Sequence, residues 1–110
     1  MSHERIERSK SAIEGADHIS AEKKSELLGL LSRLKPAIEK VSETHERNAQ
    51  NIADLVEAST HEATRDQKSP ERLKTLLHKL KESVEEFEAS HPELVAFVVE
   101  YSALLSALGI

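Results

Sequence analysis

Between about residues 21 and 66, mostly apolar residues recur alternately four and three positions apart, which is the heptad spacing of a coiled coil. The run follows Ser20, a residue type that caps helix N-termini, and meets no strong helix terminator before about Asp66. Pro36 lies inside the run but off the seam, so we expect it to bend the helix without changing the phase. One long helix over about 21–66 is therefore predicted. Its seam positions are Leu27, Leu31, Leu34, Ile38, Val41, His45, Asn48, Ile52, Leu55 and Ser59.

A turn is predicted at residues 66–69, because the residues that follow are typical of a helix start. Ser69 can cap the helix, Pro70 suits its first position, and Glu71 carries negative charge near the positive end of the helix dipole. The seam of this second arm again alternates between four and three. It consists of Leu73, Leu77, Leu80, Val84, Phe87, His91, Leu94, Val98, Tyr101, Leu105 and Leu108.

The second arm contains Ser90-His91-Pro92, which allows two interpretations. The heptad phase continues through these residues, which favours one helix over about 70–108 with a kink at 90–92. A serine shortly before a proline is also typical of a helix start, and in that case the chain turns back here. The preserved phase makes the kinked helix the preferred interpretation.

These elements predict an all-α fold in one domain over residues 1–110. A short helix over about 2–14, with Ile6 and Ile13 seven residues apart, precedes a long antiparallel helical hairpin that resembles a coiled coil. A hairpin of only two helices buries too little apolar surface to offset the conformational entropy that the chain loses on folding. Residues 94–110 are also apolar on more than one face, as in a helix with several neighbours. We therefore expect a homodimer or higher homo-oligomer that completes a helical bundle.

Composition agrees with a soluble helical protein and excludes several kinds of site. Apolar residues make up 38% and charged residues 32% of the chain, and there are three aromatic residues among 110. The net charge of -5 and the lack of a basic cluster argue against nucleic-acid binding. The absence of cysteine excludes disulfides, thiolate metal sites and cysteine catalysis. The polar N-terminal residues do not resemble a signal peptide, so a cytoplasmic location is expected.

The residues expected to form the core and the interface between chains are the apolar seam positions. They are Leu27, Leu31, Leu34, Ile38, Val41, Ile52, Leu55, Leu73, Leu77, Leu80, Val84, Phe87, Leu94, Val98, Tyr101, Leu105 and Leu108. Folding the two arms together brings His45 and Asn48 near His91, which predicts a polar layer that sets the register of the helices. Imidazoles in a seam suggest pH-dependent assembly as an alternative.

Two other functional alternatives come from particular residues. Glu88 and His91 have the Glu-x-x-His spacing of metal sites in helical bundles, and with His45 they are candidate ligands, for zinc above all. His45 has Ser42 three residues before it, so the second Glu-x-x-His of such sites is missing. Residues 94–110 alternatively attach the protein to a membrane, although this segment is short for a span and contains Glu100.

The segments "KKSELLGLLSRLKPAIEKVSETH", "IADLVEASTHEATR" and "SHPELVAFVVEYSALLSALGI" resemble a family of short, uncharacterised bacterial helical proteins classed as a domain of unknown function. The resemblance covers nearly the whole chain, and its most specific parts are Ser90-His91-Pro92 and Leu108-Gly109-Ile110. It implies a small, helical, self-contained protein. It implies no catalytic residue, substrate or cofactor.

The sequence therefore predicts a non-catalytic structural or interaction protein that associates with itself. No phosphate-binding loop, nucleophile elbow or catalytic triad pattern is found in the chain. No cofactor is expected, and an unidentified protein partner is a further possibility. Nothing in the sequence identifies that partner.

Overall fold

The computed structural model describes residues 2–109, with the side chains of residues 3–108. Five α-helices follow one another: α1 (Ser2–Glu14), α2 (Ala21–Ser42), α3 (Glu46–Thr64), α4 (Pro70–Val84) and α5 (Pro92–Gly109), with a short 3-10 helix η1 (Glu85–Phe87) after α4. The described residues contain no strand. The all-α class predicted from the sequence is confirmed.

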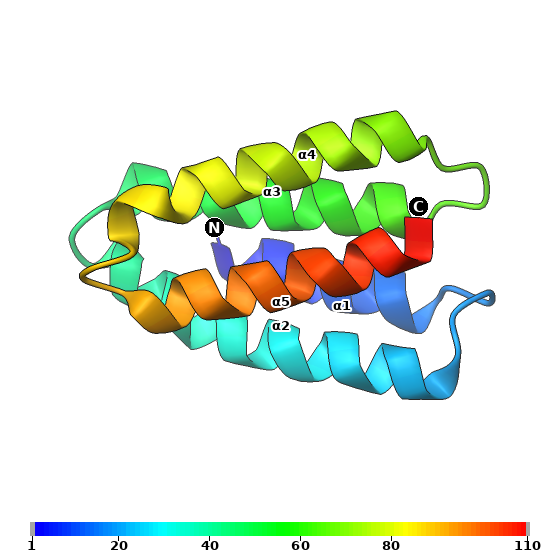
Figure 1. Ribbon diagram of the computed structural model, residues 1–110. Helices are drawn as coiled ribbons and strands as arrows, with labels where there is room; N and C mark the ends of the chain where they lie inside the picture. The colour runs from blue at the N-terminus through cyan, green and yellow to red at the C-terminus, as the bar shows by residue number, and fades with distance from the viewer. Residues whose placement is uncertain (1, 110) are drawn as a thin grey trace.

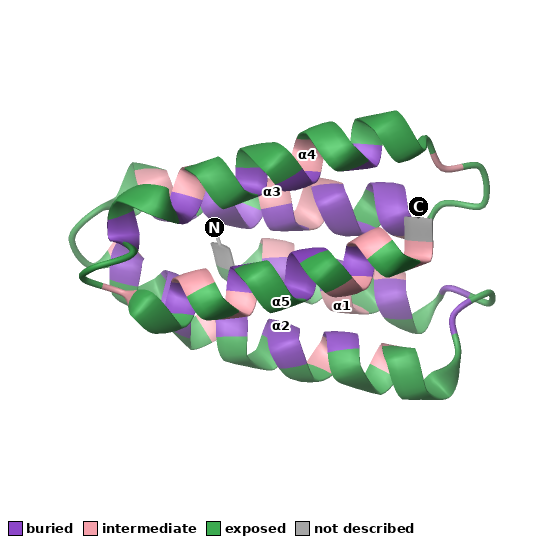
Figure 2. Cartoon of the chain, viewed as in Figure 1, coloured by how far each residue is buried: buried purple, intermediate pink, exposed green. Residues whose placement is uncertain are grey.

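Successive helices run in opposite directions along a bundle that measures 38 × 24 × 21 Å (Figure 1). α3 lies at the centre and contacts all four other helices, while α5 contacts α2, α3 and α4. Small residues on α3, including Ala49, Ala53 and Ala63, are fully buried and allow its neighbours to approach closely. Figure 2 shows the buried segments of the helices turned towards the middle of the bundle.

The predicted single helix over 21–66 is wrong, because the chain turns back after Ser42. The N–H groups of Thr44 and His45 both donate to the Val41 carbonyl, at 3.2 and 2.7 Å, and α3 then starts at Glu46. Residues 42–48 are seven consecutive polar residues, so a helix there has no apolar face to bury. Folding the arm into α2 and α3 places both apolar stripes in one core. Pro36 does lie inside α2, as predicted, and is exposed.

The preferred interpretation of residues 90–92, a kinked helix, is also wrong. α4 tightens into η1, the His91 N–H donates to the Phe87 carbonyl at 2.7 Å, and α5 begins at Pro92. Proline suits this first position because it has no N–H and its φ angle is already helical. The heptad phase continues through the turn although α4 and α5 are separate helices, both of which contact α3.

The loop at residues 65–69, between α3 and α4, lies where a turn was predicted and is held by a buried carboxylate. Glu62 is 3% exposed and accepts a hydrogen bond from the Ser69 N–H at 2.7 Å. Arg65 lies 3.0 Å and Arg72 3.4 Å from the other carboxylate oxygen. Ser69 itself caps α4 by accepting from the Arg72 N–H at 3.2 Å. The Ser69 hydrogen bond is the main reason that the pKa of Glu62 is below its ordinary value, with Arg65 and Arg72 adding to it and burial opposing it.

Because its pKa is lowered by folding, Glu62 stabilises the native state above its ordinary pKa of 4.5. This contribution is lost as the pH falls through the lower folded-state pKa. Glu62→Gln is therefore expected to be less stable than the wild type at neutral pH, with a difference that shrinks in acid. Urea unfolding of the two proteins along an acid pH series measures this, with the exposed Glu39→Gln as control. A difference that stays constant down to acid pH contradicts the assignment.

The core is built mainly from the predicted seam residues. Of the seventeen apolar seam residues, all are buried except Leu55 and Leu108, which are half-buried and pack against the core. The sequence did not indicate the polar pair inside it. Thr60 and Tyr101 are both 0% exposed, with 2.5 Å between their hydroxyl oxygens. Thr60 donates to the Val56 carbonyl at 2.7 Å, so Tyr101 is the donor in the pair.

α1 coincides with the expected helix over 2–14 and packs on α2 and α3. Ile6 and Ile13 are buried against these helices. On the same side, Arg5 forms ion pairs with Asp54 and Glu57 of α3. α1 makes no contact with α4 or α5 within the described residues, so it covers the side of the bundle opposite α5.

Candidate interaction surface

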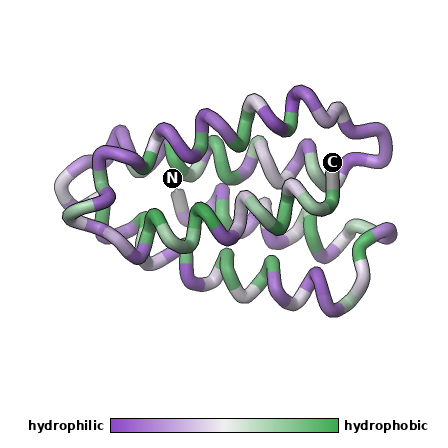
Figure 3. Tube along the Cα trace, in the orientation of Figure 1, coloured by the Kyte–Doolittle hydropathy of each residue, from purple (hydrophilic) through white to green (hydrophobic). Residues whose placement is uncertain are grey.

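α5 differs from the other helices because it carries apolar residues on its outer as well as its inner side. Glu93 and Glu100 are its only charged residues. Its fully buried inner residues include Leu94, Val98, Tyr101 and Leu105, whereas Ala96, Val99, Ala103 and Ala107, the outer row, are exposed. Val99 is 48% exposed and is the only large hydrophobic residue classed as exposed in the described part of the chain. The trace of α5 is correspondingly apolar along much of its length (Figure 3).

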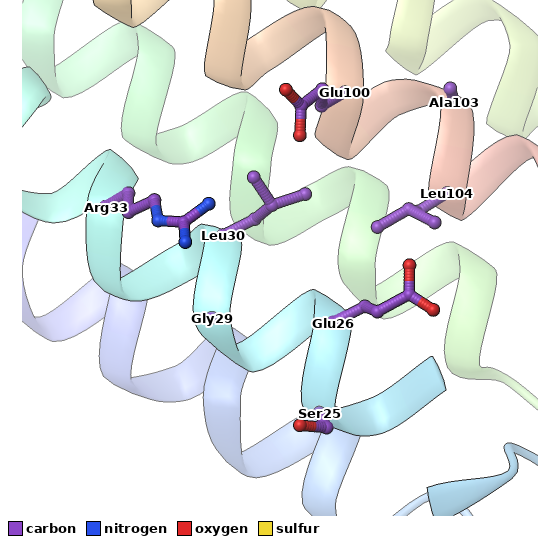
Figure 4. A pocket seen from close by; sticks show the side chains of 8 residues that line it. All are labelled: Ser25, Glu26, Gly29, Leu30, Arg33, Glu100, Ala103 and Leu104. Atoms are coloured by element: carbon purple, nitrogen blue, oxygen red, sulfur yellow. The ribbon is translucent and has the colours of Figure 1, made fainter. Parts of the chain in front are cut away.

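A groove of about 490 Å³ lies between α2 and α5. Figure 4 shows Leu30 of α2 and Leu104 of α5 reaching into the space between the helices, with charged side chains around them. Gly29 keeps one wall open, because a Cβ atom added there would meet nothing within 4 Å. The lining residues are Ser25, Glu26, Gly29, Leu30, Arg33, Glu100, Ala103 and Leu104.

A second groove, of about 430 Å³, lies on the other side of α5, against α4. Its lining residues are Lys74, Leu77, His78, Lys81, Val99, Ser102, Ala103 and Ser106. Ser102 is only 6% exposed, and its Oγ has no hydrogen-bond partner among the described residues. A buried hydroxyl without a partner is unfavourable, but this oxygen is closed off from the surface of the groove.

The outer row of α5 and its two grooves form one surface, which we call the α5 face. Ala103 lines both grooves, so they meet across the middle of α5. The α4 side of the face is basic, with Lys74, His78 and Lys81, whereas the α2 side contains two acids, Glu26 and Glu100, and one base, Arg33. Further along the α2 side, Arg33 and Lys40 lie beside Glu93. The face is therefore apolar along its centre, basic at its α4 edge, and mixed in charge at its α2 edge, where acids outnumber bases by one.

His45 and His91, predicted to lie in a seam, meet instead at the loop end of the bundle. Both rings contact Phe87 edge to face, with ring centroids 5.3 Å apart for His45 and 5.7 Å for His91. Each Nδ1 also lies within hydrogen-bond distance of the preceding hydroxyl, Thr44 at 2.8 Å and Ser90 at 2.9 Å. The predicted proximity of the two histidines is therefore found, through a shared contact with Phe87.

The predicted polar layer is wrong, because these residues lie in or beside the turns. His45 is exposed, and Asn48 and His91 are only half-buried. Asn48 donates to Glu86 at 3.1 Å on the surface. Helix register is set elsewhere, by the buried core. An effect of histidine protonation on assembly stays a prediction.

The metal site that the sequence suggested as an alternative is without support, and the suggested membrane attachment through residues 94–110 is not supported by a spanning helix. Among residues 2–109, no group of three or more His, Cys, Asp or Glu side chains is placed to hold a metal ion, and this includes the candidates His45, Glu88 and His91. In the part of the chain that the structure describes, no helix is both long and apolar enough to cross a membrane.

Sequence reasoning missed the outward position of Val99 and the orphan hydroxyl of Ser102. The predicted packing of residues 94–110 among several neighbours is found, because α5 contacts α2, α3 and α4, but its outer row is left exposed. The signal was present in part, since the apolar residues of this segment are too widely spread for a single seam. Without the fold, however, the outer row could not be separated from the inner one.

The comparisons with known proteins give a family for this chain. The family model described as "Domain of unknown function (DUF4404)" matches residues 24–110. The chain belongs to the DUF4404 family. This confirms the resemblance seen in the sequence, although the expected bacterial origin stays a prediction. No match was found among curated proteins or among solved structures.

The DUF4404 match starts inside α2 and includes α3, α4 and α5, while α1 precedes it. Every residue that lines the two grooves of the α5 face lies in the matched region. The α5 face therefore belongs to the DUF4404 part of the chain.

Proposed function

We propose that this DUF4404 protein is a non-catalytic helical interaction protein that self-associates through the α5 face. The observation that carries the proposal is the outer row of α5, which leaves Val99 48% exposed between two grooves. Apolar surface of this kind, bordered by polar groups, is typical of a site where proteins meet. The cytoplasmic location expected from the sequence is part of the proposal.

The dimensions of the molecule support pairing of two copies. One side of the bundle, 38 Å long and 21 to 24 Å wide, is large enough for the roughly 800 Å² that each partner buries in a standard interface. The alanines of the outer row are small, so a second helix can approach α5 closely. Charged groups at the edges of the face match the polar rim of such interfaces.

The proposal predicts that Val99→Glu prevents self-association. In a symmetric pair, the two introduced carboxylates come together at the centre of the contact, where they repel each other and lose water, so the affinity is expected to fall by about a hundredfold or more. Light scattering on a size-exclusion column, at several concentrations, measures the molar mass. The wild type is expected at twice the chain mass of 12.3 kDa, and Val99→Glu at the chain mass itself.

Gln50→Glu provides a matched control, because it makes the same charge change at an exposed position of α3 outside both grooves. It is expected to keep the wild-type mass. Circular dichroism checks that both variants remain helical. A wild type that is monomeric at all concentrations contradicts self-association, and a Val99→Glu protein with the dimer mass shows that the α5 face is not the contact.

A further inference from the structure

The outer row of α5 follows the helix axis closely. Ala96 and Ala107 are eleven residues apart, which is about three turns of an α-helix, so both lie on the same side of α5. Val99 and Ala103 lie between them on that side. Two α5 helices can therefore pack side by side at a small crossing angle along most of their length.

Symmetry leaves two ways to stack two copies face to face. The two-fold axis must lie in the plane of the interface, either along α5 or across it. An axis along α5 makes the two α5 helices parallel and places α4 of each copy over α2 of the other. An axis across α5 makes them antiparallel and places α4 over α4 and α2 over α2.

The charges at the two edges of the α5 face distinguish these arrangements. With the axis across α5, the basic groups Lys74, His78 and Lys81 meet the same groups of the second copy, which is repulsive. With the axis along α5, this basic edge meets the mixed edge, whose carboxylates Glu26 and Glu100 outnumber its one cation in the groove, Arg33. Glu26 and Lys74 lie towards the same end of the bundle, because each is near the start of its helix and α2 and α4 start at the same end (Figure 1).

From these observations we infer that two copies of this chain pair through parallel α5 helices, with the α4 edge of each on the α2 edge of the other. The inference rests on the proposed function and adds the partner surface and its orientation.

Single cysteine substitutions test the orientation, because the chain contains no cysteine of its own. In the parallel pair, position 96 meets position 96 of the second copy, and position 107 meets position 107. In an antiparallel pair whose two-fold axis crosses the middle of α5, position 96 meets position 107. These positions are separated by about 16 Å along the helix, and a disulfide needs Cα atoms within about 7 Å, so the two arrangements give different products.

Ala96→Cys and Ala107→Cys are each treated with a mild oxidant, alone and as a mixture, with the exposed Gln50→Cys as a control for random collision. The expected result is a disulfide-linked dimer from each variant alone, well above the control. Cross-linking that appears only in the mixture overturns the parallel pair while self-association through the α5 face still holds. If the variants have the dimer mass but form no more disulfide-linked dimer than Gln50→Cys, the parallel pair is overturned. If the wild type is a monomer, the proposed function is overturned as well.

Exchanging the charges of Glu26 and Lys74 gives a second test of the orientation of the pair. Glu26→Lys and Lys74→Glu are each expected to weaken dimerisation by about three- to tenfold. The double variant, Glu26→Lys with Lys74→Glu, restores both contacts in the parallel pair and is expected to recover the wild-type affinity. A double variant that is no stronger than the single variants contradicts the parallel arrangement.

Discussion

Replacing Phe87 with alanine is expected to lower the free energy of unfolding by about 3–5 kcal/mol, the usual cost of removing a buried phenylalanine ring. Phe87 is 3% exposed and packs in the core at the end of α4. Its ring also contacts His45 and His91, one from each loop at this end of the bundle. The substitution therefore leaves a cavity and removes the contact that the two loops share.

Phe97→Ala is the matched control, because Phe97 is the other phenylalanine of the chain and is only half-buried on α5. Its expected loss is about 1–2 kcal/mol, since less apolar area is returned to water. Urea unfolding followed by circular dichroism, at one protein concentration, measures both. Equal losses for the two variants contradict the central role assigned to Phe87.

Raising the pH above about 10 is expected to destabilise the protein through Tyr101. Burial is the main reason that the pKa of its phenol lies well above the ordinary value of 10.0. The folded protein keeps a proton that the unfolded chain releases. Stability is therefore complete below about pH 10 and declines by up to about 1.4 kcal/mol for each pH unit above it.

The measurement is the free energy of unfolding between about pH 9 and pH 11.5 for the wild type and Tyr101→Phe. Lysine titration is common to both proteins, so the difference between their slopes reports the phenol. Because Tyr101 is the only tyrosine and the chain has no tryptophan, phenolate absorbance also follows this one residue. It is expected to appear together with unfolding. The prediction is contradicted if the free energy of unfolding falls equally with pH in the wild type and in Tyr101→Phe. It is also contradicted if phenolate forms while the helices remain intact.

Local signals in the sequence predicted the starts of helices well. Ser20 caps α2 by accepting from the Lys23 N–H, and Ser69 with Pro70 starts α4, because caps depend on residues next to one another in the chain. The same signal was present at Pro92. The heptad phase, however, favoured one continuous helix. Two separate helices that face one core can show the same spacing, so the phase does not distinguish the two cases.

The lengths of the helices were overestimated because heptad spacing does not distinguish one long seam from two short ones. The polar residues 42–48 marked the turn between α2 and α3, but they were interpreted as part of a seam. The α5 face depends on which helices surround α5, and this is decided by contacts between residues far apart in the chain. The pairing of Thr60 with Tyr101, across 41 positions, is of the same kind.

The position of α5 between α2 and α4, against α3, also bears on how the chain folds during synthesis. α5 leaves the ribosome after the three helices that it packs between, so their shared apolar groove stays open to water until its residues emerge. During this interval Thr60 has no Tyr101 beside it, and Leu80 and Val84 lack part of their cover. The nascent chain is therefore most prone to aggregate, and most in need of chaperones, just before α5 is complete.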